Sequence, residues 1–312
     1  MILHLWPVLG GVLLGWALGS NDAANIFGTG IATNLIRFRN ATILISIFVA
    51  LGAVLEGPKV FQTFSGLSTQ IPLTAFISTV SAGTVVALMS YRGLPVSTSQ
   101  AIVGAVLGIG LVNHSADFRM FGKVFLCWVF TPVGGALFSL LYYEILSRIF
   151  RSGKMPLHIY TAFLRGGIVL AGCYGAYALG SNNVGNVTGV FVAAGILGPL
   201  AAALVGAASI SLGVFSLSKN VMYTIGKQIF PLDPFSALVV VVAEATTVHV
   251  FTQVGVPVSA SQAVVGAVLG VGLRKNVRAV SRRRVLDILG AWILTPLSAG
   301  TLSFLAYLFL QK

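Results

Sequence analysis

The sequence predicts an all-α integral membrane protein made of two inverted-topology repeats, and three observations support this. First, 56% of the residues are hydrophobic and 8% are charged, with a mean hydropathy of +0.95, so a soluble domain could not cover itself with polar surface. Second, two polar motifs each occur twice in the same order: Gly19–Asn25 returns as Gly180–Asn186, and Gly93–Gln100 returns as Gly255–Gln262. Third, the apolar runs give each half about three membrane crossings, one of them broken, and a re-entrant helical hairpin.

The first two crossings precede the hairpin. The first starts at Ile2 without a basic flank or a cleavage site, so we expect it to be retained as a helix. It runs to about Ile36 and is interrupted by the Asn-Asp motif. The second crossing covers Ala41–Leu55, and a short amphiphilic stretch follows from Lys59 to Gln70.

The hairpin and a long third crossing complete the half. A spanning helix needs about 20 apolar residues, whereas Val96–Leu111 is shorter and rich in glycine. We therefore pair it with Pro72–Tyr91 as the two arms of a re-entrant hairpin with its tip at Leu94–Ser99, and assign the third crossing to Phe121–Ile149. The second half follows the same plan, so we expect a first repeat over residues 1–157 and a second over 158–312.

The basic residues predict the orientation. Three crossings per half force the second half to insert upside down relative to the first. If the N-terminus is outside, 14 of the 19 Lys and Arg residues fall on the cytoplasmic side, as the positive-inside rule requires. They are Arg37, Arg39, Arg148, Arg151, Lys154, Arg165, Lys219, Lys227, Arg274, Lys275, Arg278, Arg282, Arg283 and Arg284. We expect a multi-pass protein of the cytoplasmic membrane with both termini outside.

The duplicated Asn motif is costly inside a membrane unless it lines a cavity or breaks a helix over a site. Asn and Gly at Gly19–Asn25 and Gly180–Asn186 can interrupt the helix, and half-helix ends then offer N–H groups to anions and carbonyls to cations. A polar contact between helices is the simpler alternative. Asp22 is the most informative charge, because a carboxylate in a span is either a Na⁺ ligand or a proton carrier.

The hairpin tips predict anion binding. Pro95 limits the preceding helix, and Ser97–Ser99 can cap the next one, so that free N–H groups point at the tip. An oxyanion fits there. Plain helix capping explains one copy, but it does not explain why Ser259–Gln262 repeats the pattern before a second Gly-rich helix. Two inverted hairpins would bring two positive helix ends together near the midplane.

A few other charged residues have two interpretations each. Arg92 is expected at the rim of the site, because its counterpart in the second half is apolar. Glu56 either pairs with Lys59 at the membrane face or takes part in cation coupling. Glu244 and His249 form either a proton relay or a local pair near an interface.

Several function classes are excluded. Cys127 and Cys173 lie in apolar stretches and predict no redox chemistry. No residue grouping has the spacing of a metal enzyme, and no phosphate-binding loop for ATP occurs, so we expect neither an enzyme nor a bound cofactor. The excess of basic residues lies between apolar runs and indicates topology, not nucleic-acid binding.

The four motif copies together resemble the PiT family of inorganic phosphate transporters, which also includes sulfate permeases. The resemblance covers nearly the whole chain. It implies one transport domain, often in a homodimer, that moves inorganic phosphate with Na⁺ or H⁺. By motif position it implies anion binding by Asp22, Asn25, Ser97, Thr98, Ser99, Asn186, Ser259 and Ser261, with ions near Asn21, Asp22, Asn182 and Asn183. Gln100, Gln262, Glu56, Thr63, Thr224 and Arg92 are accessory candidates.

The chain departs from the family pattern in three places. Asn183 stands where the family usually carries Asp, the second Ser-Thr-Ser is Ser259-Ala260-Ser261, and a large loop between the halves is missing. The first change removes a negative charge, which leaves the coupling stoichiometry and the choice of ion open.

These residues lead to one favoured function and two alternatives. We expect alternating-access symport of phosphate with a cation, Na⁺ being favoured over H⁺, at a midplane site. A protonated phosphate can donate a hydrogen bond to an unpaired Asp22, which sulfate cannot, but a Na⁺ ion on Asp22 would make a sulfate permease credible. An anion channel is the alternative from another class.

Overall fold

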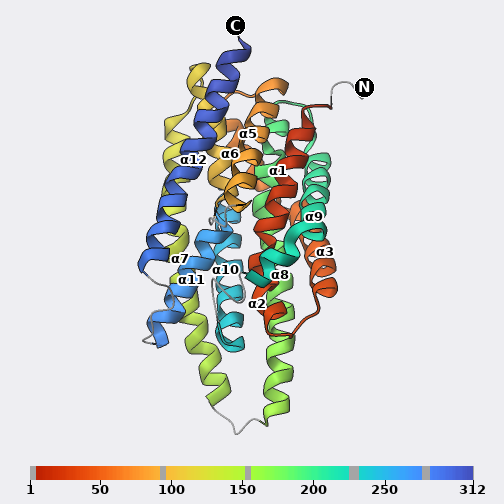
Figure 1. Cartoon of the computed structure of the whole chain (residues 1–312), viewed down its shortest axis with the longest axis vertical. Helices are drawn as coiled ribbons and strands as arrows, with labels where there is room; N and C mark the ends of the chain where they lie inside the picture. The colour runs from red at the N-terminus through yellow and green to blue at the C-terminus, as the bar shows by residue number, and fades with distance from the viewer. Residues whose placement is uncertain (1–4, 92–95, 152–155, 225–231, 276–281, 312) are drawn as a thin grey trace.

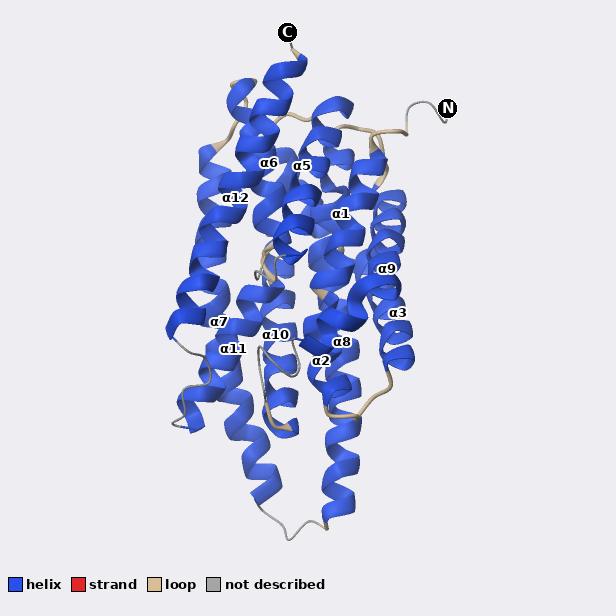
Figure 2. Ribbon diagram, viewed as in Figure 1, coloured by secondary structure: helices blue, strands red, loops and turns tan. Residues whose placement is uncertain are grey.

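The computed structural model describes residues 5–91, 96–151, 156–224, 232–275 and 282–311, and these form an all-helical bundle without a strand in any of those ranges (Figure 2). The helices of the first half are α1 (Val8–Asn21), α2 (Ala23–Ala32), α3 (Phe38–Glu56), α4 (Pro58–Leu67), α5 (Pro72–Tyr91), α6 (Thr98–Val112) and α7 (Phe118–Arg151). Those of the second half are α8 (Leu157–Ala193), α9 (Pro199–Thr224), α10 (Pro234–Val254), α11 (Ala260–Lys275) and α12 (Arg282–Leu310).

The first crossing is interrupted at the predicted place. Helix α1 ends at Asn21, Asp22 forms a turn, and α2 starts at Ala23. The backbone N–H of Asp22 still bonds to the Leu18 carbonyl at 2.8 Å, and the carbonyl of Asp22 accepts from the N–H of Asn25 at 3.1 Å. The break is therefore short, and it leaves the Asp22 side chain at a junction between two helices.

The corresponding break in the second half is absent, and this expectation was wrong. Helix α8 runs without interruption from Leu157 to Ala193, through Gly180–Asn186. The Asn side chains of this copy bond to other side chains and to the second hairpin. Because those side chains have tertiary partners, they do not compete with the helix for its own backbone groups.

Both predicted hairpins form. In the first, α5 and α6 pack together, and Ser97 caps α6 by accepting a bond from the N–H of Gln100 at 3.3 Å. In the second, α10 and α11 pack together, and α10 ends at Val254 with Gly255 as its C-cap, whose φ of 77° is one that glycine adopts without strain. We call residues 96–99 tip 1 and residues 255–259 tip 2.

The packing of the two halves repeats itself. Helix α6 packs on α12 and α11 on α7, while α1 packs on α9 and α3 on α8. Each of these contacts has its counterpart when the halves are exchanged. The hairpin α5–α6 lies in the upper half of the molecule and α10–α11 in the lower half, and α1 begins at the end where α12 finishes (Figure 1). This arrangement is what two inverted repeats would produce, although the inversion itself stays a prediction.

Two matching glycines allow the closest helix contacts. A Cβ on Gly104 in α6 would clash with the carbonyl of Pro296 in α12, and a Cβ on Gly266 in α11 would clash with the carbonyl of Pro132 in α7. Both hairpins are therefore set against a long crossing by a residue that has no side chain. These contacts set how closely each hairpin packs against the long crossing.

We expect Gly266→Val to destabilise the protein by about 1–3 kcal/mol, since the added methyl groups would push α11 away from the backbone of α7. Thermal unfolding of the purified protein in detergent measures the effect. Gly166→Val in α8 is the matched control, because a Cβ there has no heavy atom within 4 Å. Equal melting temperatures for the two variants would contradict the close contact.

The outer surface is that of a multi-pass membrane protein. Within the described ranges seven helices are long and apolar enough to cross a membrane, namely α3, α5, α7, α8, α9, α10 and α12. In the most apolar 18-residue windows of α7 and α12 only 28% and 22% of the window is buried inside the bundle, against 56% in α5 and 67% in α10. The long crossings therefore face outward, and the hairpin arms lie inside the bundle.

Candidate functional site

The two hairpin tips touch each other through a reciprocal pair of hydrogen bonds. Ser99 of the first hairpin donates from its hydroxyl group to the carbonyl of Val258 at 2.6 Å. Ser261 of the second hairpin donates to the carbonyl of Val96 at 2.9 Å. The predicted meeting of the tips is thus observed, and the contact is made by Ser99 at the end of tip 1 and by Ser261, two residues after tip 2.

Two helices begin at this contact. Ser97 caps α6, and Ser259 accepts a bond from the N–H of Gln262 in the first turn of α11 at 3.3 Å. Ser97, Thr98, Ser99 and Ser259 are at most 2% exposed, whereas Ser261 is half-buried. Helix N-termini carry free N–H groups and partial positive charge, so two of them facing one buried place favour an oxyanion.

Asp22 lies beside tip 1 and has no cationic partner among the described side chains. Its Oδ2 accepts a bond from the hydroxyl group of Thr98 at 3.2 Å, and its Oδ1 lies 3.5 Å from the amide nitrogen of Asn21. The side chain is 3% exposed. A buried carboxylate with so few hydrogen-bond partners is costly as a free anion. It therefore favours the binding of either a cation or a proton.

The second copy of the Asn motif contacts both tips. The Nδ2 of Asn186 donates to the Ser99 hydroxyl at 3.1 Å and to the Oδ1 of Asn183 at 2.7 Å. Asn182 holds tip 2: its Nδ2 donates to the Thr252 hydroxyl at 3.1 Å and to the Val256 carbonyl at 3.0 Å, and its Oδ1 accepts from the N–H of Val258 at 2.9 Å. Asn182 therefore has a structural task that would compete with its predicted role beside an ion.

Buried polar atoms without a partner mark the place for a ligand. Among the described residues, the Oε1 atoms of Gln100 and Gln262, the Oδ1 of Asn186 and the Nδ2 of Asn183 have no hydrogen-bond partner. Each of these four side chains is at most 4% exposed. Orphaned polar atoms are costly in a protein interior, so several of them around two helix starts favour a binding site for a polar ligand. Three acceptor oxygens suit a cation, and the helix N-termini suit an anion.

The remaining predicted residues lie further from the tip contact or outside the described part. Thr63 in α4 donates to the Gly255 carbonyl at 2.5 Å and so supports tip 2. Asn21 and Asn25 are half-buried at the α1–α2 junction. Arg92 lies outside the described residues, and Thr224 is described only as the last residue of α9.

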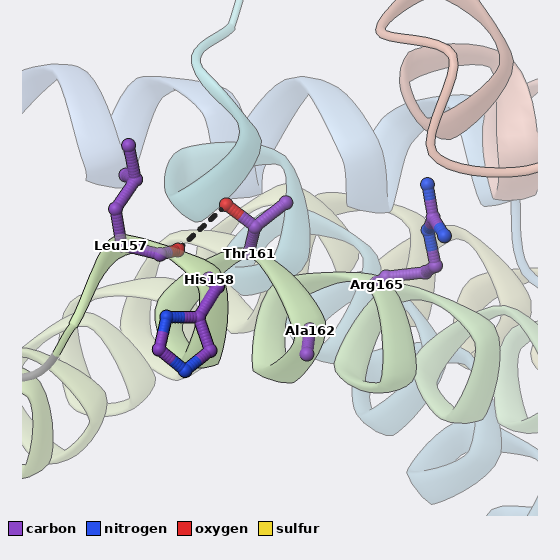
Figure 3. A pocket seen from close by; sticks show the side chains of 5 residues that line it. All are labelled: Leu157, His158, Thr161, Ala162 and Arg165. Carbon is purple, nitrogen blue, oxygen red and sulfur yellow. Dashed lines mark hydrogen bonds between the residues drawn. The ribbon is translucent and has the colours of Figure 1, made fainter.

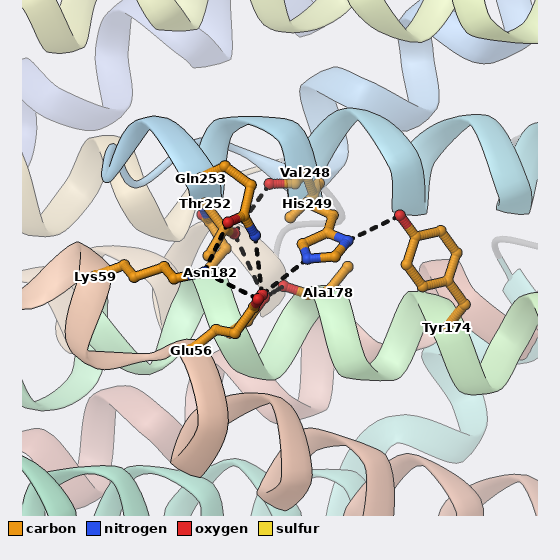
Figure 4. A network of polar contacts seen from close by, with 10 residues as sticks. Glu56, Lys59, Tyr174, Ala178, Asn182, Val248, His249, Thr252 and Gln253 are labelled. Carbon is orange, nitrogen blue, oxygen red and sulfur yellow. Dashed lines mark hydrogen bonds and ion pairs between the residues drawn. The ribbon is translucent and has the colours of Figure 1, made fainter.

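A polar network next to tip 2 was only partly predicted (Figure 4). Glu56 pairs with Lys59 at 3.0 Å, as expected. It also bonds to the Nε2 of His249 at 2.8 Å and to the amide of Gln253 at 3.0 Å, while the Nδ1 of His249 lies 2.9 Å from the hydroxyl group of Tyr174. The network ties α3 and α4 to α10. His249 is therefore paired with Glu56 and not with Glu244, and no spacing in the sequence could have shown this.

Two contacts that hold tip 2 in place were not predicted from the sequence. Thr252 receives the amide bond of Asn182, and the indole nitrogen of Trp128 donates to the Pro257 carbonyl at 3.3 Å. Trp128 belongs to a segment that recurs in the second half, but its position in a long apolar run gave no indication of a contact with the other hairpin.

A surface pocket lies apart from the motifs. It is lined by Leu157, His158, Thr161, Ala162 and Arg165, all at the beginning of α8 (Figure 3). The hydroxyl group of Thr161 bonds to the Leu157 carbonyl of its own helix. None of the predicted site residues lines this pocket, so we do not assign the site there. Within the described ranges no group of three or more His, Cys, Asp or Glu residues could hold a metal ion.

The chain is similar over most of its length to named permeases and to a solved transporter structure. A Methanocaldococcus jannaschii protein provisionally named a phosphate permease is 30% identical over 288 residues, covering 92% of this chain and 91% of that protein. The sulfate permease of Bacillus subtilis is 29% identical over 97% of this chain and 87% of its own length. A solved structure of a sodium-dependent phosphate transporter matches all of this chain and 99% of its own with a TM-score of 0.86 and 25% identity.

The family of the chain is shown by a family model that matches most of its length. The model of the phosphate transporter family matches residues 18–303, which include both Asn motifs and both tips. The family resemblance stated from the motifs is thereby confirmed, as is the expectation that the protein is a transporter and not an enzyme. The chain belongs to the phosphate transporter family.

Proposed function

We propose that the protein is a secondary active transporter that imports inorganic phosphate together with a cation, by alternating access to one site between the tips. The observation that carries this proposal is the pairing of two kinds of group in one buried place. Two helix N-termini suit an anion, while Asp22 and three orphaned amide oxygens suit a cation. An anion channel would need only the helix N-termini, and not the carboxylate and amide oxygens that suit a cation.

Na⁺ is the cation that we favour for Asp22. The similarity to a sodium-dependent phosphate transporter supports it, as does the supply of hydroxyl, amide and carboxylate oxygens around the α1–α2 junction. Phosphate is favoured over sulfate by the match to the phosphate transporter family and by the similarity to that phosphate transporter. The similarity to a sulfate permease keeps sulfate as the alternative substrate.

Residues 1–157 and 158–312 serve in this proposal as inverted repeats of one transport domain in the cytoplasmic membrane, with both termini outside. The repeated packing of the halves and the basic residues at the ends of α7 and α11 support it. A membrane-impermeant reagent should label a single cysteine placed at Gln311 on intact cells, and should label one placed at Arg148 only after the cells are broken open. Homodimer formation is implied by the family resemblance and is checked by mass measurement in detergent.

Proteoliposomes that contain the whole chain provide the test of transport. Uptake of labelled phosphate should be saturable and should collapse when the inward Na⁺ gradient is removed. Uptake of labelled sulfate by the same vesicles, compared with uptake of phosphate, shows which of the two anions is the substrate. Anion currents that ignore every cation gradient would support a channel and overturn the symporter.

Replacing Asn183 by Asp should increase the dependence of uptake on Na⁺. The unpartnered Nδ2 becomes a charged oxygen next to the Asn186 amide, which can still donate to it. We expect a steeper response of the uptake rate to Na⁺ concentration and about one more Na⁺ per phosphate. Asn113→Asp, at the half-buried C-cap of α6, is the control for the added charge. An unchanged ion ratio would contradict the proposed second cation position.

A further inference from the structure

Glu244 is a buried carboxyl group that the proposed transport cycle does not yet use. It lies in the middle of α10, is 4% exposed, and its Oε2 has no hydrogen-bond partner among the described residues. Its counterpart in the first half is Ala82, so the carboxyl group is not repeated with the duplicated motifs. A side chain this costly to bury needs a physical reason.

The surroundings of Glu244 do not provide a cation. Its neighbours along the helix, Ala243, Ala245, Val241 and Val248, are buried and apolar, and the hydroxyl group of Thr247 bonds to the backbone. The described titratable or charged side chains on α10 and on the helices packed against it are Lys59, Arg119, Lys123, Cys127, Tyr142, Tyr143, Glu144, Arg148, His158, Tyr160, Arg165, Cys173, Tyr174, Tyr177, His249, Arg274 and Lys275. Of the cations, Lys59, Arg148, His249, Arg274 and Lys275 pair with other groups, and Arg119, Lys123 and Arg165 are exposed.

One buried charged group lies on a neighbouring segment, and it has the same sign. Asp22 immediately precedes α2, which packs against α10. Two buried carboxylates on neighbouring segments inside a bilayer cannot both stay ionised cheaply unless a cation joins them. Na⁺ needs several oxygen ligands, which Asp22 has nearby and Glu244 lacks. A proton needs only the carboxyl group.

We propose that Glu244 is a proton-binding site, and that its proton is carried through the membrane together with phosphate. This rests on the proposed phosphate symport. Glu244 provides the second half with a carboxyl group. The Asn motif of that half has none, because Asn183 occupies the position that corresponds to Asp22. A cation bound at Asp22 removes the repulsion and favours release of the proton from Glu244, so the occupancies of the two sites are linked.

The proton itself can be observed without transport. The infrared difference spectrum between the wild type and Glu244→Gln, recorded on the purified chain at neutral pH without Na⁺, should show the carbonyl band of one protonated carboxyl group. The band should be weaker when Asp22→Asn is compared with the double variant, because that change also removes the repulsion from Asp22. Adding Na⁺ should weaken it in the wild type. A difference spectrum without the band overturns the proposal.

Transport tests what the proton does. With Na⁺ equal on both sides and the membrane potential clamped at zero, a pH gradient of one unit acting on one extra proton corresponds to about a tenfold difference in accumulation. Glu244→Gln should therefore accumulate about tenfold less phosphate than the wild type while it still exchanges phosphate for phosphate. Glu244→Asp, which keeps the carboxyl group, should recover accumulation.

The outcomes separate the two proposals. If Glu244→Gln accumulates phosphate as the wild type does, or if Glu244→Asp fails as completely as Glu244→Gln, the carboxyl group carries no coupled proton. If the wild type exchanges no phosphate at all, the proposed function fails, and the carried proton fails with it. The infrared band still decides whether Glu244 binds a proton in that case.

Discussion

Asp22→Asn is expected to abolish cation-driven phosphate uptake. The change keeps the size of the side chain but removes the negative charge, and with it one charged oxygen from the place where Thr98 donates to Oδ2. Interactions with a charged group are worth about 1.5–3 kcal/mol, and each 1.4 kcal/mol is tenfold in affinity. We therefore expect the apparent Na⁺ affinity to fall by about 10- to 100-fold and uptake at a fixed gradient to be lost.

The matched control is Asp117→Asn at the exposed start of α7. Asp117 accepts bonds from the N–H groups of Arg119 and Met120 at 2.8 and 2.9 Å, and Asn caps a helix about as well as Asp does. Uptake by this variant should match the wild type. Normal Na⁺-coupled uptake by Asp22→Asn would remove Asp22 from the coupling site, and an equal loss in both variants would trace the effect to general damage.

The parts of the fold that local chemistry determines could be predicted from the sequence. The break at Asp22, the arms of both hairpins and the capping serines of the tips follow from polar residues in apolar runs and from proline and serine at helix boundaries. The pairing of Glu56 with Lys59 follows from their spacing at the α3–α4 junction. In each case the signal and the structure lie within a few residues of each other.

What the sequence could not show depends on contacts between distant segments. The Asn motif of α8 resembles that of the first half, yet its helix continues, because Asn182 and Asn186 find partners in the tips. The reciprocal bonds of Ser99 and Ser261 and the pairing of Glu56 with His249 likewise join residues more than 150 positions apart. The roles of the predicted residues toward phosphate and Na⁺ stay predictions.

Asn182→Leu should be the most damaging of the changes at the tips. Leucine has a similar volume but cannot replace the three bonds of the Asn182 amide, so Thr252, the Val256 carbonyl and the Val258 N–H lose a partner. An orphaned buried group costs about 1–3 kcal/mol. Thermal unfolding in detergent should show a marked loss of stability, and phosphate uptake should be lost, because tip 2 would no longer be held against tip 1.

Asn21→Leu is the informative control, because Asn21 occupies the same motif position in the first half. Its amide lies 3.5 Å from Asp22 and makes no bond to the described part of tip 1. We expect little loss of stability from this variant, although its place beside Asp22 should still weaken the response to Na⁺. Equal destabilisation by the two changes would mean that the motif copies share one structural role. A loss of stability confined to Asn182→Leu would mean that the second copy positions a hairpin, while the first copy provides the charge.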